Sequence, residues 1–232
     1  MPDYTRIGSF YPHSIAGRLP AEAGRYTEQK KGYYIFKRGF DILVSLLLIA
    51  VVFSWLLPII ALVIKLDSGG DIFFVQKRVG KDGRLFMCYK FRTMIANREA
   101  DYLQATKNDP RITRCGEWLR RSNLDELPQL INVFLGEMSM IGPRPHMPAD
   151  CSRFASLVPG YQFRNLVKPG ITGLAQVKGY HGPSPDYESI YRRYQWDAFY
   201  IRNAGIALDI RIMITTAIQG IGIRQELTYP AQ

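Results

Sequence analysis

The feature that most constrains this chain is a run of 23 residues without a charged side chain, from Ile42 to Ile64. At about 1.5 Å per residue, a helix of this length reaches across roughly 30 Å of hydrocarbon. The run is too long and begins too late for a cleaved signal peptide, and it ends in "KLDSGG" without a small-residue cleavage motif. We therefore predict a membrane helix that stays in the protein.

Two features of this run bear on whether it crosses the membrane. Pro58 lacks an N–H and clashes with the preceding turn, so it predicts a kink or break. Basic residues flank both ends, which favours placing both ends on the cytoplasmic side. A re-entrant helix fits both features, and an ordinary single-pass helix that tolerates a proline is the alternative. The flanking residues are Lys30, Lys31, Lys37 and Arg38 before the run, and Lys65, Lys77, Arg78, Lys81 and Arg84 after it.

The charge balance indicates an anionic partner. Thirty Lys and Arg residues against twenty Asp and Glu give a formal net charge of +10, which suits nucleic acid, acidic lipid or a phosphorylated substrate. The three cysteines lie far apart and form no CxxC pair, so neither a disulfide framework nor a zinc site is indicated. The three histidines are too scattered to form a local metal motif.

The remaining patterns predict an α/β fold that is mostly helical with a small β-hairpin. Residues 71–94 contain two β-rich runs joined at Asp82-Gly83, a pair that suits a tight turn. Short helices are expected within 96–106 and 115–122. Residues 167–186 are rich in Gly and Pro and predict a ligand-holding loop. A helical region follows, and its last part, 206–223, is amphipathic enough to lie on a bilayer or pack in the core.

Asp125 and Glu126 stand side by side in "RSNLDELPQL" and admit two interpretations. With Asn123 before them, they fit a helix N-terminal capping pattern, where acids favour the helix dipole. Alternatively, they belong to a phosphoryl-transfer site, because carboxylates bind Mg²⁺ and an aspartate can act as a nucleophile. The second interpretation is favoured by nearby arginines, whose planar side chains match phosphate: Arg111, Arg114, Arg120, Arg121 and Arg144.

Five motifs occur in order along residues 37–222: "KRGFDIL", "FFVQKRVG", "YKFRTM", "LRRSNLDELPQLINVFLGEMSMIGPRPH" and "VKPGITGLAQVKG". Through these motifs the chain resembles the bacterial sugar transferases, which are monotopic polyprenyl-phosphate phosphoglycosyl transferases. The resemblance implies transfer of a sugar 1-phosphate, with a hexose as the favoured sugar, from a UDP-sugar to polyprenyl (undecaprenyl) phosphate, with release of UMP. Surface glycan synthesis would begin with this step.

The resemblance also implies roles for single residues. Asp125 would be the catalytic nucleophile that carries a covalent phosphosugar, and Glu126 would act with it as the ligand of a Mg²⁺ cofactor. Pro58 would mark the break of a re-entrant membrane helix. Substrate-binding roles would fall to Lys90, Arg92, Arg120, Arg144 and Asp197. For Asp197, a structural acid paired with an arginine is the alternative.

The implied organisation is a polar arm (1–36), a re-entrant helix (37–67), a cytoplasmic catalytic domain with membrane-surface helices (68–224) and a tail (225–232). The protein would lie on the cytoplasmic face of the bacterial inner membrane, in contact with lipids and without a nucleic acid partner. A homodimer is compatible with this picture, and a short form without further membrane helices is expected. The chain departs from the usual pattern at Leu57, which precedes Pro58 where Ser is frequent, and at Lys178. The rival hypothesis is a membrane-tethered basic module that binds acidic lipid or nucleic acid.

Overall fold

The computed structural model describes residues 25–95, 109–182 and 186–221. In this part of the chain the helices are α1 (Arg25–Glu28), α2 (Lys31–Leu48), α3 (Ser54–Asp67), α4 (Arg114–Arg121), α5 (Gln129–Leu135), α6 (Pro148–Leu157), α7 (Leu174–Val177), α8 (Tyr187–Asn203) and α9 (Ile206–Ile221). The strands are β1 (Phe73–Val79), β2 (Leu85–Phe91), β3 (Ser139–Ile141) and β4 (Gly170–Thr172). The described part is mostly helical with a small hairpin, as predicted. The helix expected within 96–106 lies outside the described residues.

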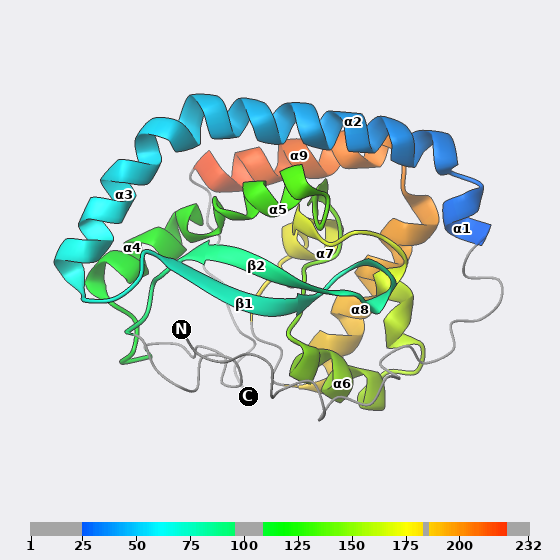
Figure 1. The fold of residues 1–232 in the computed structure, drawn as a ribbon. Coiled ribbons are helices and arrows are strands. Elements are labelled where there is room, and N and C mark those ends of the chain that lie inside the picture. The colour runs from blue at the N-terminus through cyan, green and yellow to red at the C-terminus, as the bar shows by residue number, and fades with distance from the viewer. Residues whose placement is uncertain (1–24, 96–108, 183–185, 222–232) are drawn as a thin grey trace.

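The hairpin β1–β2 crosses the front of the molecule in Figure 1. Its strands pair antiparallel from Phe73 with Phe91 to Val79 with Leu85. Asp82 and Gly83 take left-handed conformations with φ of 56° and 76°, which Asp and Gly adopt more readily than most residues. The predicted turn is therefore present at this pair, within a connection of five residues. The sequence patterns did not predict the second strand pair, β3–β4, which is parallel.

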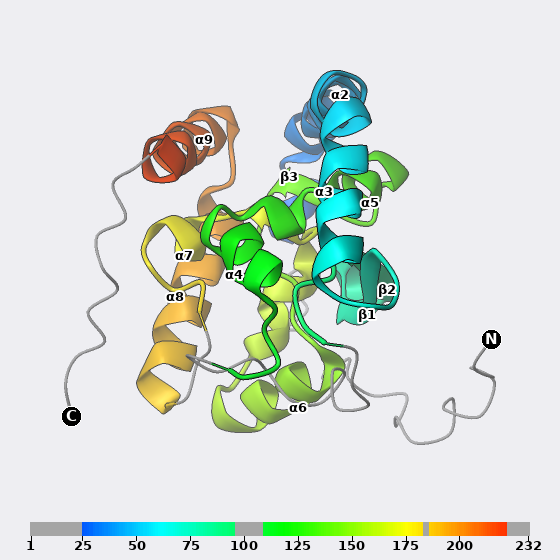
Figure 2. The ribbon, with the colours of Figure 1, turned by 90° about the vertical axis from the view of Figure 1, so that its left-hand side faces the viewer.

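The long apolar run forms one bent helix, with α2 along the top of the molecule and α3 descending from it (Figures 1 and 2). A widened π-helical turn, Ile49–Phe53, joins the two parts. The hydroxyl of Ser54 donates to the carbonyl of Ala50 at 2.7 Å, so one carbonyl in the bend keeps a partner. The structure thus confirms the bend, but the irregular turn precedes Pro58, which lies inside α3.

An ion pair connects α2 to α9, although the two helices are far apart in the sequence. Lys37 donates to Asp209 at 2.6 Å, and both side chains are about nine-tenths buried. The hydroxyls of Tyr33 and Tyr200 donate to the same carboxylate at 2.7 and 2.9 Å. With three donors on one carboxylate, the cost of burying these charges is offset by hydrogen bonds. We call Tyr33, Lys37, Tyr200 and Asp209 the anchor cluster.

Two further side chains of α2 hold it to the rest of the domain. Arg38 donates to the carbonyls of Val133 and Phe134 at 2.6 and 2.7 Å, near the C-terminal end of α5. Asp41 accepts from the hydroxyl of Ser139 and the amide of Met140 at 3.1 and 2.9 Å. The inward face of α2 is therefore polar, although its sequence is mainly apolar.

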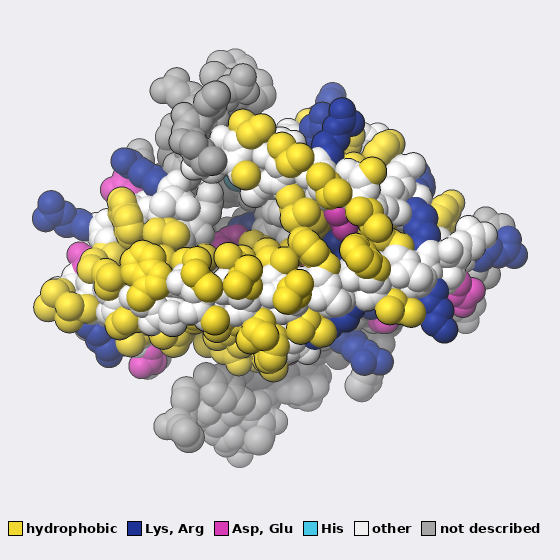
Figure 3. Space-filling view, turned by 90° about the horizontal axis from the view of Figure 1, so that it is seen from above, with side chains coloured by type: hydrophobic (Ala, Val, Ile, Leu, Met, Phe, Trp, Pro, Cys, Tyr) yellow, Lys and Arg dark blue, Asp and Glu magenta, His cyan; other side chains and the backbone are white. Residues whose placement is uncertain are grey.

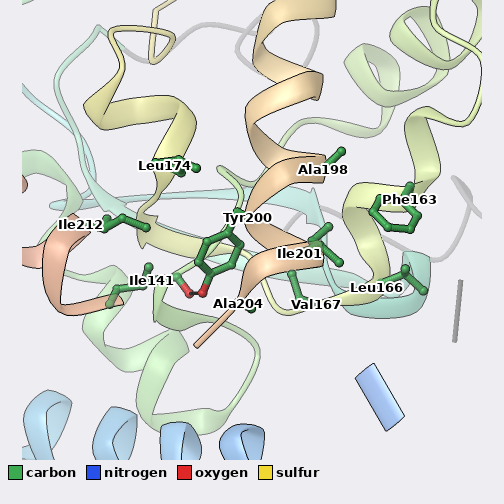
Figure 4. Packing of buried hydrophobic residues seen from close by; sticks show 10 residues of the cluster. All are labelled: Ile141, Phe163, Leu166, Val167, Leu174, Ala198, Tyr200, Ile201, Ala204 and Ile212. Atoms are coloured by element: carbon green, nitrogen blue, oxygen red, sulfur yellow. Dashed lines mark hydrogen bonds between the residues drawn. The ribbon is translucent and has the colours of Figure 1, made fainter. Parts of the chain in front are cut away.

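The largest apolar core lies between α8, α9, β3 and the loop before β4 (Figure 4). Tyr200 and Ile201 of α8, Ile141 of β3 and Ile212 of α9 are almost fully buried there. Burial of one such aliphatic side chain contributes about 1.5–3 kcal/mol relative to exposure. This core places α8 and α9 firmly against the loop that follows β3.

One face of the molecule is covered by exposed apolar side chains, in one row along α2 and α3 and another over α9 (Figure 3). The second row repeats every four residues, as expected for one face of a helix. Lys31–Asp67 is long and apolar enough to cross a membrane, and only 17% of its most apolar window is buried. An exposed apolar surface of this kind is typical of a protein or membrane contact. The exposed residues are Ile35, Phe36, Ile42, Leu43, Leu46, Leu47, Val51, Trp55, Ile59, Leu62, Val63 and Leu66, followed by Ile206, Ile210, Ile214 and Ile218.

Candidate active site

A cavity of about 600 Å³ lies between the hairpin, α6 and the turn that carries Asp125 and Glu126. Seven basic and four acidic residues line it, so its charge favours an anionic ligand. The basic residues are Arg78, Lys90, Arg92, Arg111, Arg120, Arg144 and Arg193, and the acidic residues are Asp71, Asp125, Glu126 and Asp150.

The two adjacent acids lie in a 3₁₀ turn, Leu124–Glu126, ahead of α5. Asn123, which precedes the turn, is left-handed with φ of 57°, and its side chain makes no capping hydrogen bond. Helix α5 begins only at Gln129. The capping interpretation is therefore wrong for Asn123, since it lacks the extended backbone conformation of an N-cap residue and its side chain makes no capping bond. The turn instead directs both acids to the cavity.

Glu126 is held by two basic side chains from different elements. Lys90 of β2 donates to Oε1 at 2.6 Å, while Arg144 donates to Oε1 at 2.7 Å and to Oε2 at 3.2 Å. Burial alone would raise the pKa of Glu126, but the Arg144 and Lys90 charges outweigh it and hold that pKa well below its usual range. Glu126 is thus a fixed anion at any physiological pH.

Asp125 has a different environment, although it is the next residue. Its carboxylate accepts no hydrogen bond from the residues that the structure describes. Burial, with a further contribution from the Glu126 charge, raises the pKa of Asp125 against the opposing Lys90 and Arg120 charges. A buried carboxylate without hydrogen-bond donors is more basic and more nucleophilic than a solvated one. Of the two acids, Asp125 is the one available for reaction.

The loop after β3 positions Arg144 over Glu126. Gly142 is required at the start of this loop, because a Cβ there would lie 2.4 Å from the carbonyl oxygen of Lys168. Arg164 donates to the carbonyl of Arg144 at 2.6 Å, and Arg78 donates to that of Pro145 at 3.2 Å. The backbone that directly follows the Arg144 Cα is therefore held by two other arginines.

Arg120 and Arg92, for which the resemblance implies substrate-binding roles, also line the cavity. Arg120 donates through Nε to the hydroxyl of Thr93 at 2.8 Å, and the Asp125 charge acts on it. Arg92 donates to the carbonyls of Ser68 and Gly69, in the loop that follows α3. It therefore joins the cavity wall to the end of α3.

Asp197 is not brought into the cavity. It pairs with Arg164 at 2.9 Å, and both side chains are 2% exposed. Because Arg164 also holds the carbonyl of Arg144, Asp197 is linked to the site through that arginine, and its charge also acts on Arg193 in the cavity wall. The geometry agrees with the alternative of a structural acid paired with an arginine.

Sequence reasoning missed His146 and Arg193 as members of the site. His146 directly follows Pro145 in the loop, and its ring nitrogens face the guanidinium groups of Arg164 at 3.2 Å and Arg193 at 3.3 Å. Burial and these two charges lower the pKa of His146 well below its usual value, so it stays neutral. The position of His146 beside the "GPRP" motif was the available signal. For Arg193, in the middle of α8, the sequence offered none.

The carboxylate oxygens of Asp125 and Glu126 are possible ligands of a magnesium ion. Within residues 25–95, 109–182 and 186–221, no group of three or more His, Cys, Asp or Glu side chains could hold a metal. Mg²⁺ is commonly bound by one or two carboxylates together with substrate phosphates and water. Oε2 of Glu126 accepts only the 3.2 Å bond from Arg144 among described residues, and Asp125 accepts none. This pair fits a magnesium ion shared with a phosphate, and it does not form an all-protein cage.

Comparison with known proteins agrees with this geometry. A family model described as bacterial sugar transferase matches residues 32–222. The chain belongs to the bacterial sugar transferase family. The matched range includes all but the first residue of α2, all of α3 and every residue of the candidate site described above. It confirms the resemblance seen in the sequence motifs.

Individual relatives carry names that describe reactions. A UDP-glucose:undecaprenyl-phosphate glucose-1-phosphate transferase of Klebsiella pneumoniae is 44% identical over 80% of this chain and 40% of its own length. An N-acetylgalactosaminephosphotransferase of Aeromonas hydrophila, named for UDP-N-acetylgalactosamine and undecaprenyl phosphate, is 42% identical over 83% of this chain and 46% of its own. The exopolysaccharide production protein PSS of Rhizobium leguminosarum bv. phaseoli is 44% identical over 79% of this chain and 94% of its own. The chain thus spans less than half the length of the first two relatives and most of the third.

Proposed function

We propose that the chain transfers a sugar 1-phosphate from a UDP-sugar to undecaprenyl phosphate, which yields UMP and an undecaprenyl diphosphosugar. The observation that carries this proposal is the contrast between the two acids. Glu126 is clamped by Lys90 and Arg144, while Asp125 is unengaged in a cavity rich in arginine. Membership of the family and the reactions named for its relatives support the same conclusion.

The reaction proceeds in two displacements. In the first, a carboxylate oxygen of Asp125 attacks the β-phosphorus of the UDP-sugar, and the bond from that phosphorus to the bridging oxygen breaks, so that UMP leaves with the electron pair. In the second, a phosphate oxygen of undecaprenyl phosphate attacks the same phosphorus, and the bond to Asp125 breaks. Each step needs cations around the transferred phosphoryl group. Lys90, Arg120 and Arg144 are the basic residues nearest to Asp125 and Glu126, where that group would bind.

Glu126 and Asp125 would hold a magnesium ion together with the diphosphate, as the oxygen donors noted above allow. When bound, Mg²⁺ neutralises charge on the phosphates and on the departing UMP. The clamp on Glu126 has a separate role that requires no metal: it fixes the turn, so that Asp125 keeps its position while substrates exchange.

We further propose that the protein lies on the cytoplasmic face of the inner membrane, with α2 and α3 forming a re-entrant helix. The bend at Ile49–Phe53 and the apolar face shared with α9 support this arrangement. Single cysteines introduced near Lys31 and near Arg84, in a variant whose native cysteines are replaced, test it by labelling in spheroplasts. Both positions should react only after the membrane is permeabilised. Labelling of one from the periplasmic side would mean that the helix crosses.

The transfer itself is tested by UMP release from a panel of UDP-hexoses and UDP-N-acetylhexosamines, with Mg²⁺ and undecaprenyl phosphate. Intact-protein mass spectrometry without the acceptor should reveal a phosphosugar adduct on the wild type and none on Asp125→Asn. Asp82→Asn is the matched control, since Asp82 is exposed on the hairpin turn and its left-handed backbone suits Asn. A basic binding module would release no UMP from any sugar.

A further inference from the structure

A second cavity, of about 370 Å³, lies under the N-terminal half of α2. It shares no lining residue with the cavity that holds Asp125. Five basic residues and two acidic residues line it, together with apolar and aromatic side chains. The charged residues are Lys31, Lys37, Arg38, Lys81 and Lys168, with Glu28 and Asp41. Nothing in the proposed transfer reaction uses this cavity.

The two acids offset only part of the positive charge that the five basic side chains carry. Asp41 accepts from Ser139 and Met140, which are neutral donors, and keeps its negative charge. The charge of Lys37 is balanced by Asp209, which lies outside the cavity. Arg38 donates to two backbone carbonyls, which leaves its full positive charge in place. Among the described residues, no hydrogen bond or ion pair reaches the ammonium groups of Lys81 and Lys168. The cavity therefore keeps a surplus of positive charge.

The cationic groups of Arg38 and Lys168 both lie close to Gly136. A Cβ placed on Gly136, just after α5, would lie 3.2 Å from Nη2 of Arg38 and 3.4 Å from Nζ of Lys168. Burial and the neighbouring Arg38 charge lower the pKa of Lys168, with Asp41 opposing. Cations held this close without an anion between them repel each other, and a bound phosphate would remove that repulsion.

The surroundings of this point are apolar and exposed. Ile35 and Ile42 lie about one helical turn to either side of Arg38, and both are exposed. Phe134 and Leu135, at the end of α5 that Arg38 contacts, are exposed as well. In Figure 3 basic side chains gather at this end of α2, directly beside the hydrophobic row. A ligand that fits must combine an anionic head with hydrocarbon chains.

We propose that this cavity binds the phosphate headgroup of an anionic glycerophospholipid, whose acyl chains lie along the exposed apolar side of α2. Undecaprenyl phosphate has similar chemistry, but a phosphate held here lies in a cavity separate from Asp125. The lipid therefore serves as a fixed membrane contact that sets the depth and orientation of α2, and it is not a substrate.

Native mass spectrometry of the full chain in a neutral detergent tests this proposal. With equal concentrations of dioleoyl phosphatidylglycerol and dioleoyl phosphatidylcholine, the wild type should retain phosphatidylglycerol preferentially. The double variant Lys81→Gln/Lys168→Gln should bind it roughly tenfold to thirtyfold more weakly, since each basic residue near an anionic lipid contributes about a factor of five. Lys168→Arg should keep the preference.

The matched control is Lys77→Gln/Arg84→Gln, which removes the same charge from exposed hairpin positions outside the cavity. An equal loss of lipid in this control would overturn the proposal, because net charge alone would explain it. Displacement of the lipid by equimolar inorganic phosphate would also overturn it in favour of a simple anion site. One-for-one displacement by undecaprenyl phosphate would mean an acceptor site instead. UMP release by Lys81→Gln/Lys168→Gln in detergent should match the wild type, which separates this test from that of the transfer reaction.

Discussion

The anchor cluster and the Asp125 cavity both bury charge, but they do so in opposite ways. Asp209 receives three donors, and its partner Lys37 is buried with it. In the cavity, one acid is clamped and its neighbour is left without a donor, while basic side chains outnumber acids. In the anchor cluster, complete pairing of the charges stabilises the position of α2. In the cavity, incomplete pairing leaves Asp125 and several basic side chains available to a ligand.

Residue type alone does not distinguish a structural charge from a functional one. The partners of each charged side chain do distinguish them. Asp197 illustrates the rule, since its pairing with Arg164 places it with the structural charges despite its match to a family acidic position. Substitutions in the two regions should therefore affect different quantities.

The largest effect is expected for Asp125→Asn. If the carboxylate forms the covalent intermediate, its loss should reduce UMP release by at least about a thousandfold, as is usual for removal of a nucleophile. The melting temperature should not fall, because Asp125 has no partner to lose. The two readouts are initial rates of UMP release and thermal unfolding in detergent. Retained activity near the wild-type rate would move Asp125 to the structural group.

Asp209→Asn should show the reverse pattern. Removing one charge of a buried pair leaves Lys37 uncompensated, which costs about 3–5 kcal/mol and lowers the melting temperature by roughly 6–20 °C. Activity per folded molecule at low temperature should stay close to that of the wild type. Glu188→Gln serves as control, because its pair with Arg192 is exposed on α8 and should hardly affect unfolding. Equal melting temperatures for both variants would contradict the assigned role of the anchor cluster.

An intermediate effect is expected for Arg144→Lys, which keeps the charge but loses the planar fork. Loss of one charge-assisted hydrogen bond costs about 1.5–3 kcal/mol, which is roughly tenfold to a hundredfold in turnover if the bond acts in the transition state. Steady-state kinetics with the preferred UDP-sugar measures this, with Arg121→Lys on the exposed side of α4 as control. A rise in KM alone would instead indicate ground-state binding. Unchanged kcat and KM would exclude Arg144 from the reaction.

The smallest effect concerns the pH dependence of stability. The raised pKa of Asp125 means that its ionised form destabilises the fold at neutral pH. Asp125→Asn should therefore unfold at a slightly higher temperature than the wild type at pH 7.5, and the difference should vanish below about pH 4, where an unfolded aspartate is protonated too. The lowered pKa of Glu126 has the opposite sign, so Glu126→Gln should be less stable at neutral pH, and this difference should persist down to about pH 4, below which an unfolded glutamate becomes protonated. Thermal unfolding from pH 4 to pH 8 compares the two, and a less stable Asp125→Asn at pH 7.5 would contradict the assignment.

The sequence predicted those parts of the fold that depend on local patterns. The apolar run, the hairpin turn at Asp82-Gly83 and the helices α4, α8 and α9 follow from length, turn chemistry and periodicity. The pair β3–β4 was missed because its strands are three residues each, too short for an alternating pattern. The anchor cluster joins positions more than 160 residues apart, a pairing that local patterns do not encode.

The candidate site was predicted less completely. The ordered motifs indicated Asp125, Glu126, Lys90, Arg120 and Arg144, and all of them line one cavity. Motif matching could not separate Asp197 from them, because the partner of a buried acid is set by tertiary packing. Nor could it reveal that Lys90 and Arg144 both bind Glu126 and leave Asp125 open.

The π-helical turn at Ile49–Phe53 also has a consequence for helical phase. In a regular α-helix each residue turns the chain by about 100°, so Ile60 would face roughly 60° away from Ser45, which is buried in α2. A π-helical turn accommodates one additional residue, which brings Ile60 and Ile64 back to the buried side. Deleting one residue from this turn would therefore preserve the buried face while removing the widened turn. Inserting one would rotate α3 by about 100° and expose its packed side, so this stretch should tolerate loss of length better than gain.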